Sequence, residues 1–158
     1  MTTPLSSPFP AVRAPAGRRS AGAIALFVTA LLGVAWNAFG VVQWAGSLGA
    51  TQDTLMGRGM TAVQSAAYLA LPGWMTVAFA VGVFGGLLGS VGLAARRRVA
   101  LPLFAVSLVA YIALYAGDLA HGLFDVMPTQ QPILNAVVAI AVVLPLAALA
   151  ARRQGLLR

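Results

Sequence analysis

The chain alternates between four long apolar runs and shorter polar segments. The runs cover about residues 21–44, 72–95, 99–121 and 132–151. Each is about 20 residues long, which is the length that an α-helix needs to cross the hydrocarbon core of a bilayer. Almost no charged residue falls inside a run. The pattern predicts an all-α protein, a transmembrane bundle of four helices.

The polar segments predict one longer loop and several short connections. Residues 1–20 are rich in Pro, Ser and Gly and are expected to form a disordered cytoplasmic arm. Residues 45–71 exceed a simple turn, and Thr51-Gln52-Asp53-Thr54 is typical of a helix start. We expect one or two short interfacial helices in this first periplasmic loop, on the outer membrane surface, with a flexible loop as the alternative.

The arginines predict the orientation of the chain. There are ten arginines and no lysine, against three Asp and no Glu, for a net charge of +7. Three arginines lie in the arm, three at Arg96, Arg97 and Arg98, and three in the tail, residues 152–158. Nine of the ten therefore fall on one side of a four-span chain, and positive charge marks the cytoplasmic side. Both termini are expected in the cytoplasm, with Arg96–Arg98 as the main topogenic turn.

Composition narrows the class of protein. Hydrophobic residues make up 60% of the chain and charged residues 8%, with a mean hydropathy of +0.90. These values exclude an ordinary soluble domain. The arginines flank apolar runs and do not line one basic face, so nucleic acid is not expected as a partner. The Ala-rich, Lys-free composition suggests a bacterium, and hence a multi-pass protein of the inner membrane.

Known catalytic and metal-binding patterns are missing from the sequence. There is no cysteine, and one His with three Asp offers few metal ligands. No phosphate-binding loop, dinucleotide fingerprint, H-E-x-x-H motif or serine nucleophile elbow is present. We therefore expect no enzymatic activity, no catalytic residue, no cofactor and no metal site.

Glycines in the second run predict close helix packing. Gly82-x-x-x-Gly86 and Gly85-x-x-x-Gly89 are patterns of small residues that let two helix backbones approach. The contact could form within one chain or between copies, and a flexible gating helix is the alternative. Because the Arg96–Arg98 turn is short, the second and third spans should be antiparallel neighbours.

Polar residues of the first and third runs each share one helix face. Trp36, Asn37 and Gln43 lie within an arc of about 120° in the first run. The two amides are costly against lipid, so this face is expected to point into the bundle. It could serve packing alone, through hydrogen bonds between helices, or form part of a site.

The third run carries the ionisable pair. Ser107, Tyr111, Tyr115, Asp118 and His121 share a face that runs toward the outer end. Asp118 and His121 are three residues apart, so they can meet on the helix surface. They could end the helix as a cap, or form a site for a ligand or a proton.

The two polar faces together predict one candidate site. Both faces carry most of their polar residues toward the outside, beneath the segment 51–71. The candidate pocket consists of Trp36, Asn37, Gln43, Tyr111, Tyr115, Asp118 and His121.

Several stretches resemble a family of small bacterial four-span membrane proteins of undefined role, often labelled "sugar transporter". The resemblance covers most of residues 36–108. It rests on Trp36-Asn37-x-x-Gly40-Val41-x-Gln43-Trp44, Pro72-x-Trp74, Phe79-Ala80-x-x-Val83-Phe84-Gly85-Gly86-x-Leu88-Gly89-Ser90, the arginine turn and Leu103-Phe104-x-x-Ser107-Leu108. The resemblance implies a membrane protein with four helices.

Two functions follow as expectations. Small size, glycine-rich packing faces and the lack of a deep charged pathway favour a non-enzymatic accessory or assembly protein. The alternative is a transporter of small sugar-like or polyol-like molecules that works as an oligomer. The expected partners are the lipid bilayer and either further copies of the chain or another membrane complex.

Overall fold

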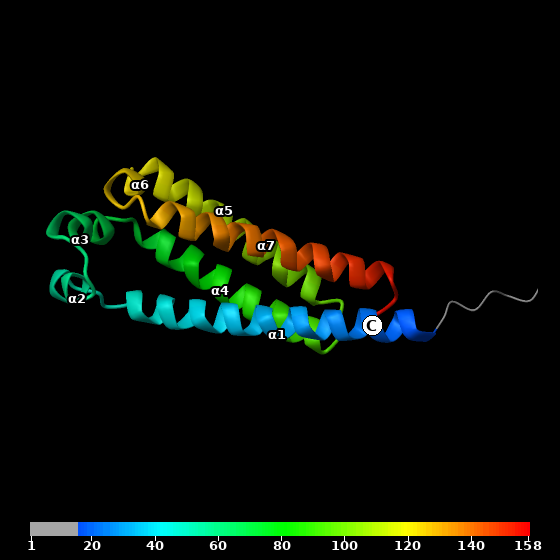
Figure 1. The fold of residues 1–158 in the computed structure, drawn as a ribbon. Coiled ribbons are helices and arrows are strands. Elements are labelled where there is room, and N and C mark those ends of the chain that lie inside the picture. Colours follow the sequence, from blue (N-terminus) through cyan, green and yellow to red (C-terminus); the bar gives the residue numbers. More distant parts are fainter. Residues whose placement is uncertain (1–15) are drawn as a thin grey trace, which may run out of the picture.

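The computed structural model describes residues 16–158, with side chains from Ala21 onward, and the described part is helical with short turns (Figure 1). The helices are α1 (Ala16–Ser47), α2 (Gln52–Gly57), α3 (Ala62–Leu69), α4 (Gly73–Ala94), α5 (Ala100–Ala120), α6 (Leu123–Val126) and α7 (Gln130–Arg153). Four segments are long and apolar enough to cross a membrane: Ala21–Ser47 of α1, and α4, α5 and α7. The predicted all-α bundle of four helices is confirmed. The four long apolar helices indicate a multi-pass membrane protein.

The four long helices correspond to the four predicted spans, with differences at their ends. The expected arm was wrong for residues 16–20, because α1 begins at Ala16, and residues 1–15 lie outside the described residues. The predicted short helices of the first loop are α2 and α3. Each begins with a capping box, Thr51 with Thr54 and Thr61 with Gln64, which satisfies backbone N–H groups of the first turn. The sequence analysis missed α6.

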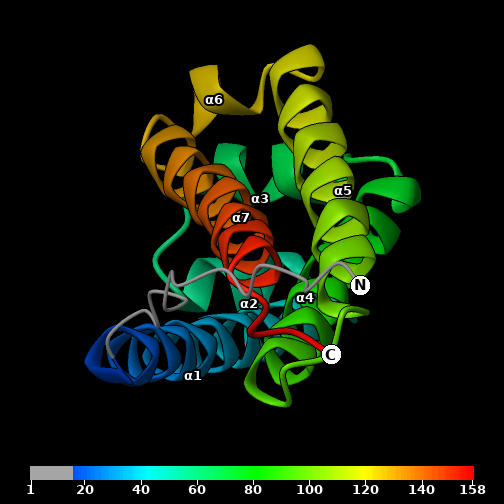
Figure 2. The same ribbon diagram turned by 90° about the vertical axis from the view of Figure 1, so that its right-hand side faces the viewer.

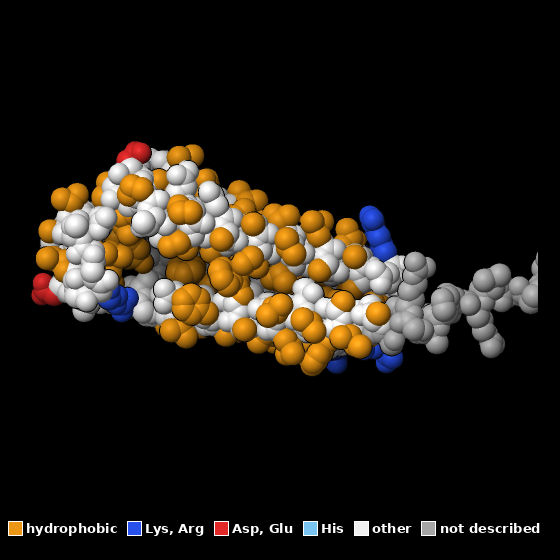
Figure 3. Space-filling view, in the orientation of Figure 1, with side chains coloured by type: hydrophobic (Ala, Val, Ile, Leu, Met, Phe, Trp, Pro, Cys, Tyr) orange, Lys and Arg blue, Asp and Glu red, His pale blue; other side chains and the backbone are white. Residues whose placement is uncertain are grey.

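The two ends of the bundle differ in charge (Figure 3). At one end, called the arginine end, lie Arg96–Arg98, Arg152 and Arg153. The opposite end, called the loop end, carries α2, α3 and α6, together with all three aspartates of the chain and a single arginine, Arg58. This asymmetry gives the fold a defined direction.

α4 is the helix on which α1 and α5 pack (Figure 2). Against α1, three contacts follow one antiparallel register: Gly33 with Ser90, Asn37 with Gly86, and Gly40 with Val83. A Cβ at Gly33 would lie 2.5 Å from the Ser90 Oγ, and one at Gly40 would lie 2.8 Å from a Val83 methyl carbon. Small residues therefore alternate between the two helices and let the backbones approach.

A second face of α4 approaches α5 in the same way. A Cβ at Gly82 would lie 2.7 Å from the Tyr111 ring, and one at Gly89 would lie 2.8 Å from the Phe104 ring. The Ser107 hydroxyl donates a hydrogen bond of 2.6 Å to the Gly82 carbonyl. The glycines of α4 thus serve contacts within one chain, with α5 at Gly82, Gly85 and Gly89 and with α1 at Gly86.

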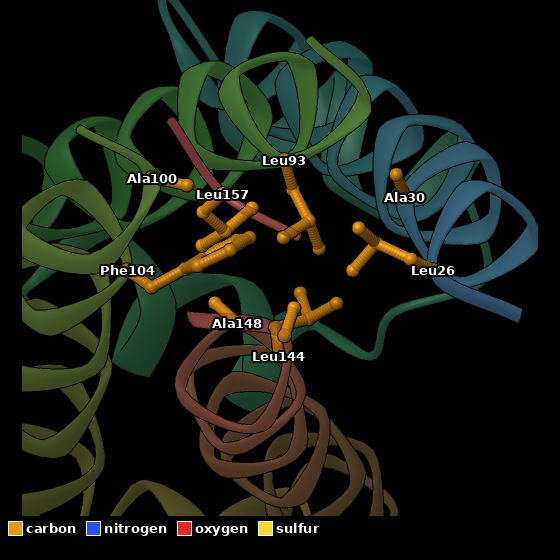
Figure 4. Packing of buried hydrophobic residues seen from close by; sticks show 9 residues of the cluster. Leu26, Ala30, Leu93, Ala100, Phe104, Leu144, Ala148 and Leu157 are labelled. Carbon is orange, nitrogen blue, oxygen red and sulfur yellow. The ribbon is translucent and has the colours of Figure 1, made fainter. Parts of the chain in front are cut away.

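An apolar cluster closes the bundle at the arginine end (Figure 4). Leu26 of α1, Leu93 of α4, Phe104 of α5 and Leu144 of α7 meet in it. Leu157, which follows α7, is only 3% exposed and packs into the same cluster.

The segment that follows α7 is part of the fold. The Arg158 N–H donates to the Arg96 carbonyl at 2.7 Å, and the Arg98 N–H donates to the Arg158 carbonyl at 3.0 Å. Of the predicted tail, residues 152–158, Arg152 and Arg153 continue α7, and the segment after them folds back against the Arg96–Arg98 turn. The sequence analysis missed this contact because it counted the segment only for its charge.

α1 and α7 are close at the arginine end and diverge toward the loop end (Figure 1). α7 packs mainly on α5, and it meets α1 and α4 over smaller areas. The bundle is therefore closed at the arginine end and open between α1 and α7 at the loop end.

Replacing Gly86 with Ala should destabilise the bundle. The added methyl group would collide with the Asn37 carboxamide, which is buried against the backbone of α4. Overpacking of this kind costs about 1–3 kcal/mol. Unfolding in mild detergent measures the loss. Gly73→Ala is the matched control, because it lies in the same helix with nothing within 4 Å of the new Cβ. Equal stability of the two variants would contradict the close contact.

Arg96 ends α4 in a backbone conformation that usually belongs to glycine. Its φ is 55°, and it is the one non-glycine residue with positive φ in the described part of the chain. The Arg97 N–H donates to the Gly92 carbonyl at 2.8 Å and the Arg96 N–H to the Leu93 carbonyl at 3.0 Å, the two bonds of a Schellman cap. Gly155 has the corresponding position after α7, with φ 69°.

Arg96→Gly should therefore stabilise the protein. A left-handed conformation costs an L-residue about 1–2 kcal/mol, and the greater freedom of glycine in the unfolded chain offsets part of that gain. We expect the free energy of unfolding to rise by about 0.5–1 kcal/mol. Arg97→Gly removes the same charge without relieving strain, so it should lower stability. If both variants were less stable than the wild type, the contacts of the Arg96 side chain would contribute more to stability than the backbone strain costs.

Candidate functional site

The candidate residues do not form one pocket, because Asn37 belongs to the packing of α1 on α4. Its side chain is 2% exposed, and its Nδ2 donates to the Gly33 carbonyl of its own helix at 2.8 Å. It also lies against Gly86. Ser90 is buried at the same interface and donates to the Gly86 carbonyl at 2.8 Å. The polar groups at this interface are thus used inside the bundle.

Trp36 and Gln43 lie on the side of α1 that faces α7. Gly22, Ala25 and Thr29 line a groove with α7, and Trp36 and Gln43 follow Thr29 by seven and fourteen residues. Each step of seven residues returns to the same face of a helix within about 20°. Trp36 is half-buried and Gln43 is exposed.

The expected burial of Gln43 was wrong, and the divergence of α1 and α7 explains why. The two helices separate toward the loop end (Figure 1), and Gln43, at the end of this face, is exposed. Figure 3 shows a hollow there, between the two helices and beneath the α2–α3 segment. Periodicity could place Gln43 on the correct side of α1, but it could not show how far away α7 would lie.

The two tyrosines of α5 pack within the fold. Tyr111 is 4% exposed, and its ring covers Gly82 on α4. Tyr115 packs against Phe124 of α6, with ring centroids 5.3 Å apart and an interplanar angle of 51°. Tyr115 therefore helps to hold α6 at the loop end.

Asp118 is a buried carboxylate near the loop end of α5. It is 3% exposed. Among the described residues, no hydrogen bond or ion pair of its carboxylate is found, and no side-chain oxygen there is both fully buried and without a partner, so the carboxylate keeps some contact with solvent. Taking an unpaired charge partly out of water is costly, so such a group takes up a proton or attracts a cation. Asp118 is thus the candidate residue whose packing alone does not explain it.

Tyr68 of α3 connects Asp118 to the loop helices. Burial raises the pKa of the Tyr68 phenol, and the Asp118 charge raises that pKa further, whereas a hydrogen bond with Ser47 and the positive charge of Arg58 lower it. Arg58 itself donates from Nη1 to the Gly46 carbonyl at 3.2 Å. Tyr68 and the three residues that affect its pKa, Asp118, Ser47 and Arg58, are called the loop-end cluster.

The sequence analysis missed three members of this cluster. Arg58 carried a signal, as the single arginine outside the three arginine-rich segments. Tyr68 and Ser47 carried none, because only the tertiary fold brings Tyr68 close enough to Ser47 and Asp118 for both to affect its pKa.

His121 caps α5. Its side chain is exposed, and its Nδ1 lies 3.0 Å from the Gly117 carbonyl, which requires the proton to be on Nδ1. Of the two interpretations of the Asp118–His121 pair, the geometry of His121 favours the cap. In residues 16–158, no group of three His, Asp or Glu side chains could hold a metal ion.

Asp118→Asn should not lower the stability of the protein. Asparagine keeps the shape of the side chain and removes the charge that burial disfavours. We expect a free energy of unfolding that is unchanged or higher by about 1 kcal/mol. Asp125→Asn, at an exposed position, is the control and should change stability by less than about 0.5 kcal/mol. A marked loss for Asp118→Asn alone would reveal a favourable partner for the carboxylate.

The polar groups of the described part are few, and most of them are engaged in the fold. In the described part, one buried acid lies near a phenol and a hydroxyl, and the single histidine is turned to the helix end. Hydrogen bonds and close packing use the remaining polar groups of the helix interfaces. No family model, no curated protein and no solved structure matches this chain.

Proposed function

We propose that the protein is a non-enzymatic accessory or assembly protein that acts by associating with other membrane-embedded helices. The arginine end faces the cytoplasm in this proposal, so that both termini are cytoplasmic and the loop end is periplasmic, as expected for a bacterial inner-membrane protein. The rule of positive charge on the cytoplasmic side supports this orientation.

The observation that carries the proposal is that the buried polar side chains between the helices are hydrogen-bonded within the bundle. Asn37, Ser90 and Ser107 are buried and hydrogen-bonded to helix carbonyls. The apolar cluster around Leu93 and Phe104 closes the arginine end. A polar route from one end to the other is therefore lacking among the described residues, whereas large apolar side chains of α1 are left uncovered.

A carrier of small polar molecules is the second candidate. The hollow beneath α2 and α3 supports it, together with the buried Asp118 (Figure 3). A bundle that is open at one end and closed at the other is one state that a carrier needs. In that case Asp118 would bind a proton or a cationic or polyol ligand from the loop end.

One experiment separates the two candidates. The tagged full-length protein is solubilised in mild detergent from the membranes of its own organism, and the copurifying proteins are identified and quantified. We expect a membrane protein at a fixed ratio to the bait. We also expect that sugars and polyols shift the melting temperature of the purified protein by less than about 1 °C.

The carrier makes the opposite prediction. A sugar or polyol would raise the melting temperature of the wild type and of Asp125→Asn, and the shift would be lost in Asp118→Asn. That result, in a preparation without a stoichiometric partner, would replace the accessory function with transport.

A further inference from the structure

One face of α1 has the residue spacing of a helix-pairing surface. Its members are separated alternately by three and four residues: Gly22, Ala25, Thr29, Leu32, Trp36, Phe39 and Gln43. This spacing is typical of two helices that pack with a left-handed crossing, in membranes as in coiled coils. We call this face the α1 seam.

α7 covers only the half of the α1 seam near the arginine end. There, Gly22, Ala25 and Thr29 line a groove of about 200 Å³ with α7. Farther along, Leu32 is 66% exposed and Phe39 is 59% exposed. Because α7 diverges from α1 toward the loop end, no helix of residues 16–158 covers the half of the seam from Leu32 to Gln43.

The uncovered half ends in an amide, that of Gln43, inside the part of α1 that is long and apolar enough to cross a membrane. The register of α1 on α4, Gly40 with Val83 and Asn37 with Gly86, places Gln43 level with Ala80. Ala80 is seven residues inside α4 from Gly73, which is about 10 Å at about 1.5 Å per residue. An exposed carboxamide at this depth needs a hydrogen-bonding partner, which lipid chains do not supply.

We propose that the uncovered half of the α1 seam binds α1 of a second copy of this chain. Two copies inserted in the same direction are related by a two-fold axis along the membrane normal. This axis places Gln43 at the same depth in both copies, with the two α1 helices side by side. A carboxamide carries both donors and an acceptor, so the two Gln43 side chains satisfy each other. The self-complementary amide is the reason for choosing a second copy as the occupant.

The other open surface of the bundle lacks such a determinant. The shallow groove between α4 and α5 is lined only by Ala and Val, among them Val81, Val106 and Val109. Lipid chains cover such a surface without leaving a polar group unpaired. Val109 therefore provides a control position, because it is 67% exposed. Val109 also lies at the same depth as Phe39. Gly82 of α4 faces Tyr111 of α5, and Val83 of α4 faces Gly40 of α1, so both positions are level with residue 84 of α4.

Cysteine cross-linking in intact membranes tests the proposal, since the chain has no cysteine of its own. Phe39→Cys and Val109→Cys are compared under mild oxidation, at equal expression. We expect Phe39→Cys to form a disulfide-linked dimer at least about fivefold more efficiently, because the bond requires the two Cα atoms to approach within about 7 Å. Equal yields at the two positions, or a higher yield at Val109→Cys, would overturn the proposal.

The contribution of the amide is measured separately. Energy transfer between labelled copies in lipid vesicles gives the dimer dissociation constant of the wild type, Gln43→Leu and Gln43→Asn. We expect Gln43→Leu to weaken the dimer about 3- to 15-fold, the range for a hydrogen bond between membrane helices, and Gln43→Asn to retain most of the affinity. An unchanged constant in Gln43→Leu would remove the amide from the interface.

The cross-linking result also distinguishes pairing between copies of this chain from the proposed accessory function. A cross-link from Phe39→Cys to a protein of a different mass would overturn pairing between copies and would leave the proposed association with another membrane protein standing. A dimer without any copurifying protein would support the α1 seam and contradict the accessory function.

Discussion

The close approach of α1 and α5 to α4 is the constraint on which the rest of the structure depends. Within a bilayer, helices gain little from leaving lipid, so they associate through backbone proximity and hydrogen bonds. Glycines on two faces of α4 allow that proximity, at Gly86 toward α1 and at Gly82 and Gly89 toward α5. Asn37 and Ser107 then make their hydrogen bonds in the same narrow interfaces. Three helices are thereby held as one unit.

α7 is held differently, and this difference shapes both ends of the bundle. At the arginine end, Leu144 and Leu157 join α7 and its following segment to the apolar cluster. Farther along, α7 follows α5 and leaves α1. The opening exposes Gln43 and the large apolar residues near it, and the hollow lies under the loop helices. The candidate partner surface and the candidate binding site therefore have one structural origin.

The loop end concentrates the groups whose roles are least explained by packing. Asp118 is only 3% exposed there, and its charge reaches Tyr68 of α3, whose pKa Ser47 and Arg58 also affect. His121, three residues from Asp118, is engaged in ending α5. The same end thus contains His121, which ends α5, and a carboxylate that makes no part of that cap, which explains why the pair allowed two interpretations.

The sequence alone determined the four spans, the antiparallel pairing of the second and third spans, and the short helices between the first two. Span length, glycine spacing and capping residues act locally or between chain neighbours, so they can be recognised along the chain. Tertiary structure decided the exposure of Gln43, the loop-end cluster and the burial of Leu157. Each depends on the angle or distance between elements far apart in sequence, and helical periodicity specifies the face of a residue without specifying what lies opposite.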